Sequence, residues 1–225
     1  MDVDLVTKVQ LPKVSVQEEV KELELCSRFV DPFLCDLFDD PDAGTFFRWN
    51  ELTVESKKKQ SSLNWRPDIT ITRLQGVRWR YNLGFGEAKK PAQPDSNLFT
   101  ICKDLLHVGV FCKNSIDPQN MDGVMALQIV GRTITVYVMV LPATGIYGMY
   151  ELGEIQVPSS VADISKLLMD MATVSYILDV FGRVCVPAVI PITTKQTQVT
   201  IRASPTEDKR NSKKKFQRNK ILIPL

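Results

Sequence analysis

The sequence predicts an α/β protein built around a mixed β-sheet. Helical and strand-like segments follow one another in the order helix, three strands, helix, strand, and then further strands and a helix. The chain has 225 residues, of which 44% are hydrophobic and 24% charged, and these values suit one globular domain with an appendage. We therefore divide it into a lead-in (1–15), a domain (16–190) and a basic tail (191–225).

The first helical region is expected from Val16 to about Val30, where apolar residues recur at steps of three and four. Its expected buried stripe consists of Val16, Val20, Leu23, Ser27 and Val30. Asp31 and Pro32 should end this helix, because proline restricts the residue before it. Asp31 is then expected to cap a short second helix that runs to about Phe38.

Three strands should follow, at Thr45–Val54, Asp68–Leu74 and Val77–Lys89, because these segments are rich in β-branched and aromatic residues and are bounded by turn signals. A long helix of about 16 residues is expected after Asn97, which can cap it. The pattern predicts no internal repeat.

The remaining elements are two strands, Val124–Val130 and Thr133–Leu141, joined at Gly131-Arg132, and a third strand at Ile146–Leu152. A last helix should start at Ser160, three residues before Asp163, in a pattern typical of a capping box. Its expected buried residues are Val161, Ile164, Leu168, Met171 and Leu178.

The charge of the chain is unevenly distributed. The net charge is +2, but Pro205–Leu225 holds seven basic and two acidic residues, which leaves −3 for the rest. Because a mildly acidic body does not attract polyanions in general, any nucleic-acid contact must be local. The tail is expected to be disordered and to serve as a nuclear localisation signal or a phosphate contact; the alternative is a solubilising tail. Its basic cluster consists of Lys209, Arg210, Lys213, Lys214 and Lys215.

Several classes of protein are disfavoured. The five cysteines form no Cys-x-x-Cys pair and the first residues form no apolar signal segment, so we expect an intracellular, reducing compartment. Apolar runs fall short of the roughly 18 residues of a membrane span. His107 is the single histidine, which argues against histidine-rich zinc sites and Ser-His-Asp catalysis.

A trio of residues carries the most recognisable chemistry. Glu87 and Lys89 lie on one face of a strand, and Asp68 begins the preceding strand, so a hairpin would bring the two carboxylates together. With the backbone carbonyl of Ala88 they would form a hard-oxygen site for Mg²⁺ or Mn²⁺, which can polarise a phosphodiester. Lys89 could then orient water or neutralise charge in the transition state. The alternative is that Asp68 is an ordinary turn residue at the start of a strand and that Glu87 and Lys89 form a solvated ion pair.

These residues and the order of the elements resemble the PD-(D/E)XK (restriction-endonuclease-like) nuclease superfamily, whose core is α-β-β-β-α-β. The resemblance covers roughly residues 16–130 and rests on Arg66-Pro67-Asp68 and Gly86–Lys90. It implies a restriction-endonuclease-like mixed central sheet flanked by helices, with C-terminal strands and a helix added. These segments, with 29–34 and 102–106, are also similar to a group of proteins from mucoralean fungi that have no established activity.

The resemblance implies further site residues. An acidic residue of the first helix often completes such sites, and Glu18, Glu19, Glu22 and Glu24 are available. We favour Glu24, which borders the expected buried stripe. The alternative is that these glutamates have no role in a site and only make the first half of the helix acidic, which is favourable with the helix macrodipole. Nucleic-acid contacts are expected at Lys103 and at Lys57-Lys58-Lys59, although a solvated helix lysine and a solvated loop are the simpler interpretations.

The expected function is a Mg²⁺-dependent nuclease that acts on DNA rather than RNA, is located in the nucleus and descends from a mobile element. The alternative is a non-catalytic PD-(D/E)XK-like module that binds nucleic acid or a protein. A third possibility is an intracellular scaffold whose trio is a surface ion pair. No membrane contact is expected, and the sequence leaves the oligomeric state open.

Overall fold

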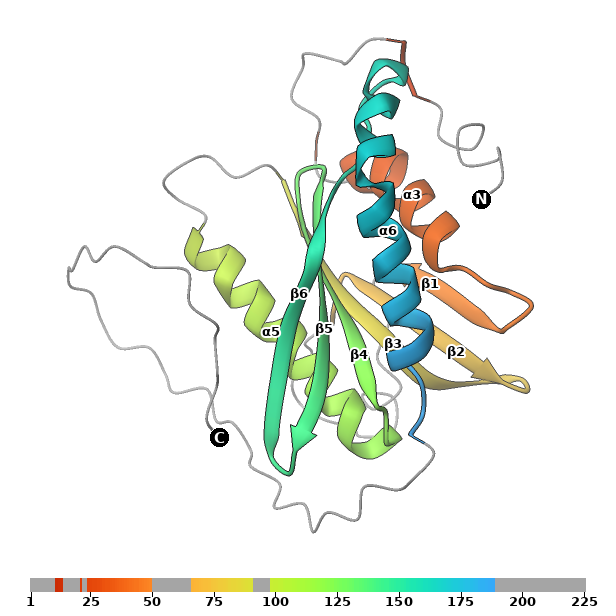
Figure 1. The fold of residues 1–225 in the computed structure, drawn as a ribbon, viewed down its shortest axis with the longest axis vertical. Helices are drawn as coiled ribbons and strands as arrows, with labels where there is room; N and C mark the ends of the chain where they lie inside the picture. Colours follow the sequence, from red (N-terminus) through yellow and green to blue (C-terminus); the bar gives the residue numbers. More distant parts are fainter. Residues whose placement is uncertain (1–10, 14–20, 22–23, 50–65, 91–97, 189–225) are drawn as a thin grey trace, which may run out of the picture.

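The computed structural model of the chain describes residues 11–13, 21, 24–49, 66–90 and 98–188, and these form an α/β fold around one six-stranded mixed sheet (Figure 1). The strands are β1 (Thr45–Trp49), β2 (Ile69–Gln75), β3 (Arg78–Lys89), β4 (Gly123–Val130), β5 (Thr133–Ala143) and β6 (Ile146–Gln156). The helical elements are η1 (Leu25–Val30), α3 (Asp31–Phe38), α5 (Leu98–Gln119), η2 (Val161–Asp163) and α6 (Ile164–Val184).

The strands lie in the sheet in the same order as in the chain. β1, β2 and β3 pair in antiparallel fashion, and so do β4, β5 and β6. β3 and β4 are parallel, which requires a crossover connection, and α5 lies in that connection. The mixed sheet that the sequence predicts is therefore confirmed.

Helices cover both faces of the sheet (Figure 1). α5 lies against the face that carries Phe85, whose ring packs 5.7 Å from that of Phe111 in α5. On the opposite face, Gly123 of β4 lies against Val184 of α6. The core fills the space between these layers and includes fully buried residues of the central strands, namely Phe85, Ile69, Ile71, Met125, Leu127 and Ile129.

The expected strands agree with the observed ones to within a few residues where the structure describes them. α5 is longer than expected, with 22 residues. Polar side chains explain the extension, because they bond to the backbone of β3 rather than to water. The backbone N–H of Asn82 donates to Gln119 Oε1 at 2.7 Å, and the Ser115 hydroxyl donates to the backbone carbonyl of Asn82 at 3.1 Å.

Asp31 and Pro32 do not separate two helices, and this expectation was wrong. Asp31 has helical dihedral angles, and the chain passes directly from the π-helical turn η1 into α3. A π-turn widens the helix locally. The buried stripe also differs from expectation, since Ser27 is exposed while Leu25 and Phe29 are buried.

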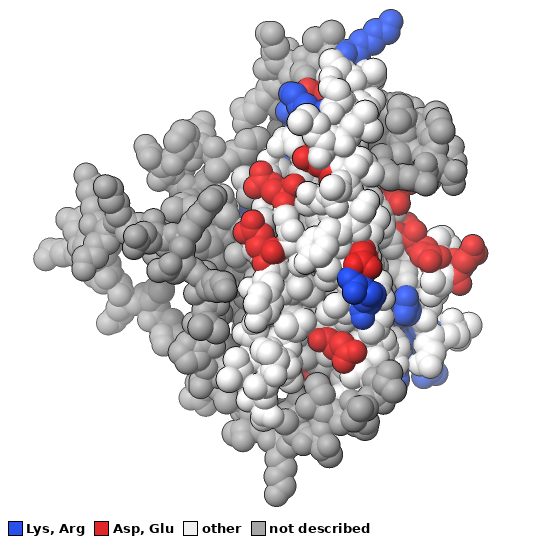
Figure 2. Space-filling model, in the orientation of Figure 1, with Lys and Arg blue, Asp and Glu red and all other residues white. Residues whose placement is uncertain are grey.

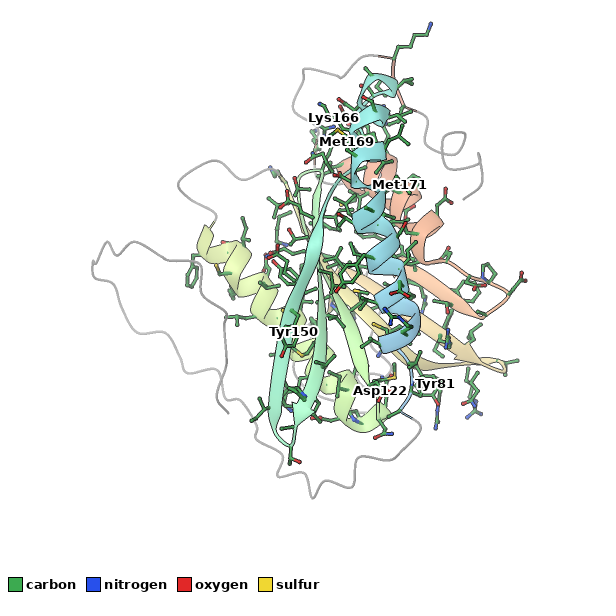
Figure 3. All side chains as sticks on the ribbon, viewed as in Figure 1. Tyr81, Asp122, Tyr150, Lys166, Met169 and Met171 are labelled. Carbon is green, nitrogen blue, oxygen red and sulfur yellow. The ribbon has the colours of Figure 1, made fainter. Side chains whose placement is uncertain are left out.

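The buried face of the last helix is displaced from the expected one. Val161 is 51% exposed and Leu168 67% exposed, whereas the helix buries Leu167, Val174, Ile177 and Val180. The displacement arises because η2 precedes α6, so the α-helical repeat begins at Ile164. Figure 3 labels Met169 and Met171 on the same stretch of α6, and Met169 is 84% exposed. Among the described helices, none is long and apolar enough to span a membrane.

Candidate carboxylate–lysine site

The β2–β3 hairpin brings Asp68 and Glu87 together, as the sequence predicts. Ile69 of β2 pairs with Gly86 of β3, so the preceding residue Asp68 lies beside Glu87. The Ala88 amide donates a hydrogen bond of 3.0 Å to Asp68 Oδ2, which fixes the aspartate against β3. A wide separation of Asp68 and Glu87, which would favour the scaffold with a surface ion pair, is not observed.

Lys89 lies among three carboxylates. Its Nζ is 3.8 Å from Asp68 Oδ2, 3.7 Å from Glu87 Oε2 and 3.7 Å from Asp104 Oδ2. These distances exceed those of direct hydrogen bonds, so the ammonium lies among three acids and acts on them electrostatically rather than donating directly to one of them. We call Asp68, Glu87, Lys89 and Asp104 the carboxylate cluster.

Asp104 is the member of this cluster that the sequence reasoning missed. It lies on α5, and its side chain is 13% exposed, with Oδ2 buried and without a hydrogen-bond partner. The adjacent Lys103, which the resemblance favoured for a phosphate contact, is exposed on the same helix. The sequence did offer one indication, because Asp104 is an acidic residue on the helix that must pack on the strand carrying Glu87. The sequence alone does not determine how this helix is rotated about its axis, and this rotation decides which of its residues face the sheet.

Burial makes Glu87 the electrostatically unusual residue of the site. Its pKa is raised to about 8, first by desolvation, then by the charge of Asp68 and a hydrogen bond with Asp68; Lys89 opposes the shift and Asp104 adds to it. At neutral pH in the absence of metal, Glu87 therefore holds a proton. The pair resembles other carboxylates that lie too close together for both to ionise.

Two neighbouring side chains border the cluster. His107 on α5 has a lowered pKa, mainly because of burial and then because of Lys103, so it is neutral at pH 7. Gln128 of β4 pairs with Glu87 in register, and its amide donates to the Ile101 carbonyl of α5 at 2.8 Å. Gln128 thus ties the start of α5 to β4, the strand next to the one that carries Glu87.

The donor set fits a hard divalent cation in part. Asp68 and Glu87 are close enough to share a hydrogen bond, and their oxygens are the ligands that Mg²⁺ prefers. Among the described residues, however, no group of three or more His, Cys, Asp or Glu side chains is arranged to hold a metal ion. A cation here would rest on Asp68, Glu87 and the Ala88 carbonyl, with waters or substrate oxygens completing its shell, as Mg²⁺ often does.

The other expected site residues do not join the cluster within the described part of the chain. Glu24 pairs instead with Arg28, its Oε1 lying 3.3 Å from the guanidinium. Lys57-Lys58-Lys59, the remaining first-helix acids and the tail cluster (Lys209, Arg210, Lys213, Lys214 and Lys215) lie outside the described residues.

Gly84 and Gly86 precede Glu87 on β3 but do not face the cluster. A Cβ at Gly86 would lie 3.0 Å from Leu127 Cβ and 3.3 Å from Ile69 Cβ, on neighbouring strands. These glycines therefore allow close packing on the sheet face opposite the cluster.

Comparison with known proteins does not extend these observations. No protein-family model matches the chain, and neither a curated protein nor a solved structure is significantly similar to it.

Proposed function

We propose that the chain is a metal-dependent nuclease that hydrolyses phosphodiester bonds in DNA, with a restriction-endonuclease-like core. The observation that supports this most is the convergence of Asp68, Glu87 and Lys89 at one end of the β2–β3 hairpin. The order of the described elements from η1 to β4 is compatible with the α-β-β-β-α-β core of that superfamily.

Each residue has a distinct role in this proposal. Asp68 and Glu87, with the Ala88 carbonyl, would hold Mg²⁺, which when bound would polarise the phosphodiester and acidify water. Glu87 would have to release its proton to solvent before it could be a ligand, so metal binding should strengthen as pH rises through its raised pKa. Lys89 provides a positive charge and hydrogen-bond donors that stabilise negative charge developing on the phosphoryl oxygens. Asp104 positions Lys89 through its 3.7 Å contact.

Cleavage of defined substrates tests the proposal. Purified protein is incubated with Mg²⁺ or Mn²⁺ and with single-stranded DNA, double-stranded DNA and RNA, beside Asp68→Asn and Glu87→Gln. Asp117→Asn is a matched control, because Asp117 lies on α5 and pairs with Lys113 at 3.0 Å, away from the cluster. DNA cleavage lost in the two site variants and kept in the control is expected. Cleavage that survives both site substitutions would refute the assignment.

The non-catalytic module remains the second candidate, and one observation favours it. The Lys89 ammonium already balances Asp68, Glu87 and Asp104, which a purely structural cluster would also require. Calorimetric titration with Mn²⁺ at pH 8.5 to 9, above the raised pKa of Glu87, separates the two candidates. Binding lost in Asp68→Asn supports the nuclease, whereas nucleic-acid binding without any Mn²⁺ uptake supports the module.

A further inference from the structure

The outer face of α6 gathers exposed hydrophobic side chains. Four of the nine large hydrophobic residues that are exposed in the described part of the chain lie on η2 and α6, namely Val161, Leu168, Met169 and Tyr176. Met169 is 84% exposed, Leu168 67% and Tyr176 52%. Single exposed hydrophobic residues are normal, but a contiguous group of them marks a surface that binds another macromolecule.

These side chains form a ridge along the helix. Leu168, Ala172 and Tyr176 are all exposed and lie four residues apart, so they form one row, and Met169 lies beside it. Rows of this spacing fit into the grooves of a second helix, and a small residue such as Ala172 at the centre lets the two backbones approach closely. We call Leu168, Met169, Ala172 and Tyr176 the α6 ridge.

Tyr150 of β6 adds to the hydrophobic surface on this side of the molecule. The direct pairs Met125–Val138 and Val138–Tyr150 place Tyr150 on the same face of the sheet as Met125. That face is the one that α6 covers, because a Cβ at Gly123, two residues before Met125, would lie 2.6 Å from Val184 of α6. Tyr150 is 50% exposed. Viewed from this side, Figure 2 shows uncharged surface that runs along α6 between charged side chains.

Two ion pairs border the α6 ridge, one at each end. Lys166 Nζ lies 3.0 Å from Asp163 Oδ1 before the ridge, and Arg183 pairs with Asp179 after it. Lys166 lies six residues before Ala172, and Asp179 lies seven residues after it. Asp163 and Arg183 lie further out, nine residues before and eleven after. A two-fold axis at Ala172 therefore brings opposite charges together at both ends of the ridge.

We infer that the α6 ridge binds a second copy of the chain, with the two α6 helices crossing in opposite directions at Ala172. The charges favour this partner. The two ion pairs sum to zero, so they select neither an acidic nor a basic surface, whereas an inverted copy of the helix matches both ends. A parallel approach would instead set Lys166 against Lys166 and Asp179 against Asp179.

This interface is independent of the proposed nuclease activity. The carboxylate cluster includes Asp104 of α5 and lies on the face of the sheet that α5 covers, so pairing through α6 leaves it open. Interdigitating rows of residues four apart predict a crossing angle of about −50° between the two helices.

Sedimentation equilibrium of the full chain over a range of micromolar concentrations tests the inference. The wild type should change from monomer to dimer as the concentration rises. Met169→Glu combined with Tyr176→Glu should raise the dissociation constant at least about tenfold, because each copy would bury two unpaired carboxylates. The matched control combines Val77→Glu with Phe99→Glu, which adds the same charge at side chains that are 96% and 79% exposed outside the ridge, and it should leave the dissociation constant unchanged.

Reversing charges tests the role of the ion pairs. Lys166→Glu alone should weaken the dimer a few-fold, since exposed ion pairs contribute little each and the two-fold axis repeats the effect. Adding Asp179→Lys to the same chain should restore the dimer, because the opposite charges again meet between the copies.

Disulfide trapping tests the antiparallel geometry. Cys102, an exposed free cysteine, is changed to Ser in every sample. With copper phenanthroline as the oxidant, Ala172→Cys should link two copies, because symmetric positions meet at the axis. Gly182→Cys, exposed on the same helix, should not, because ten residues of helix on each side would hold the two sulfurs about 30 Å apart.

Several outcomes would overturn the inference. A protein that stays monomeric at every concentration is one, and a dimer that survives Met169→Glu with Tyr176→Glu, or that the control weakens equally, is another. Trapping through Gly182→Cys rather than Ala172→Cys would refute the antiparallel arrangement. A monomer that sediments with neutral lipid vesicles, and no longer does so when Met169 and Tyr176 are changed, would assign the ridge to a membrane surface instead.

Discussion

At the scale of single residues, Glu87 decides what the cluster can do. Its side chain is 11% exposed beside Asp68, and together these features favour the protonated acid at neutral pH. A buried carboxyl group held by a neighbour is typical of functional sites, although structural ion-pair networks also produce it. A pH dependence of stability between the ordinary and the raised pKa of Glu87 follows from this group.

Glu87→Gln should remove a pH dependence of stability in metal-free buffer. The unfolded chain loses the Glu87 proton near the ordinary pKa of 4.5, whereas the folded protein keeps it to about 8. The folded state therefore binds more protons between these values, and the free energy of unfolding falls as pH rises through this window, by roughly 2 kcal/mol or more. Urea unfolding at several pH values measures this fall in the wild type, and the variant should show a flatter profile.

The control for this measurement is Glu151→Gln, which changes an exposed glutamate of β6. It should retain the wild-type profile. If the free energy of unfolding rose between pH 5 and pH 8 by the same amount in the wild type, Glu87→Gln and Glu151→Gln, the assignment of the proton to Glu87 would be contradicted.

Lys89→Met should destabilise the protein more than Lys113→Met does. Lys89 lies among Asp68, Glu87 and Asp104, whereas Lys113 pairs with one carboxylate among the described residues, that of Asp117, and lies over the Tyr147 ring. Removing the cation from partly buried acids leaves uncompensated charge, and because Lys89 is 35% exposed we expect a difference of only about 1 to 2 kcal/mol at pH 8. Denaturant midpoints measure it, and equal losses in both variants would show that the additional acids around Lys89 contribute nothing beyond one ion pair.

At the scale of elements, β3 combines two functions on its two faces. Glu87 and Lys89 leave from the face that α5 covers, while Gly84 and Gly86 allow neighbouring strands to pack closely on the other face. The strand is therefore sensitive to added volume on a side that never touches the site.

Gly86→Ala should destabilise the protein by about 1 to 3 kcal/mol, because its Cβ would meet Leu127 Cβ at 3.0 Å and the Leu127 carbonyl oxygen at 3.2 Å. Gly182→Ala is the matched substitution, since a Cβ there meets nothing within 4 Å in α6. It should be neutral or stabilise by up to about 1 kcal/mol, because alanine is the better helix former. Thermal unfolding compares them, and equal effects would contradict the packing described for β3.

At the scale of the whole molecule, much of the fold could be predicted from the sequence. Alternating and β-branched segments identified each described strand, and Gly131 at the predicted hairpin indeed has a positive φ of 62°. The continuous passage from η1 into α3 could not be predicted, because Asp31-Pro32 is also typical of a helix boundary. The buried face of α6 depends on the length of η2, which no periodicity reveals.

The candidate site was predictable only where backbone pairing determines it. Asp68 and Glu87 meet because a hairpin sets their register. Asp104 comes from a helix that packs across the sheet, so its position depends on how α5 sits on β3 and β4, which is a property of tertiary packing. The same reason explains why Glu24 was favoured for the site but pairs with Arg28.

The most direct test of the proposed nuclease is the single-turnover rate of DNA cleavage in Mg²⁺ at pH 8.5. We predict that Asp68→Asn lowers this rate at least a hundredfold while Asp117→Asn retains it, since loss of a metal-binding carboxylate removes stabilisation of several kcal/mol from the transition state. A wild-type protein that binds DNA but leaves it intact, or an Asp68→Asn variant that cleaves at the wild-type rate, would contradict the proposed activity.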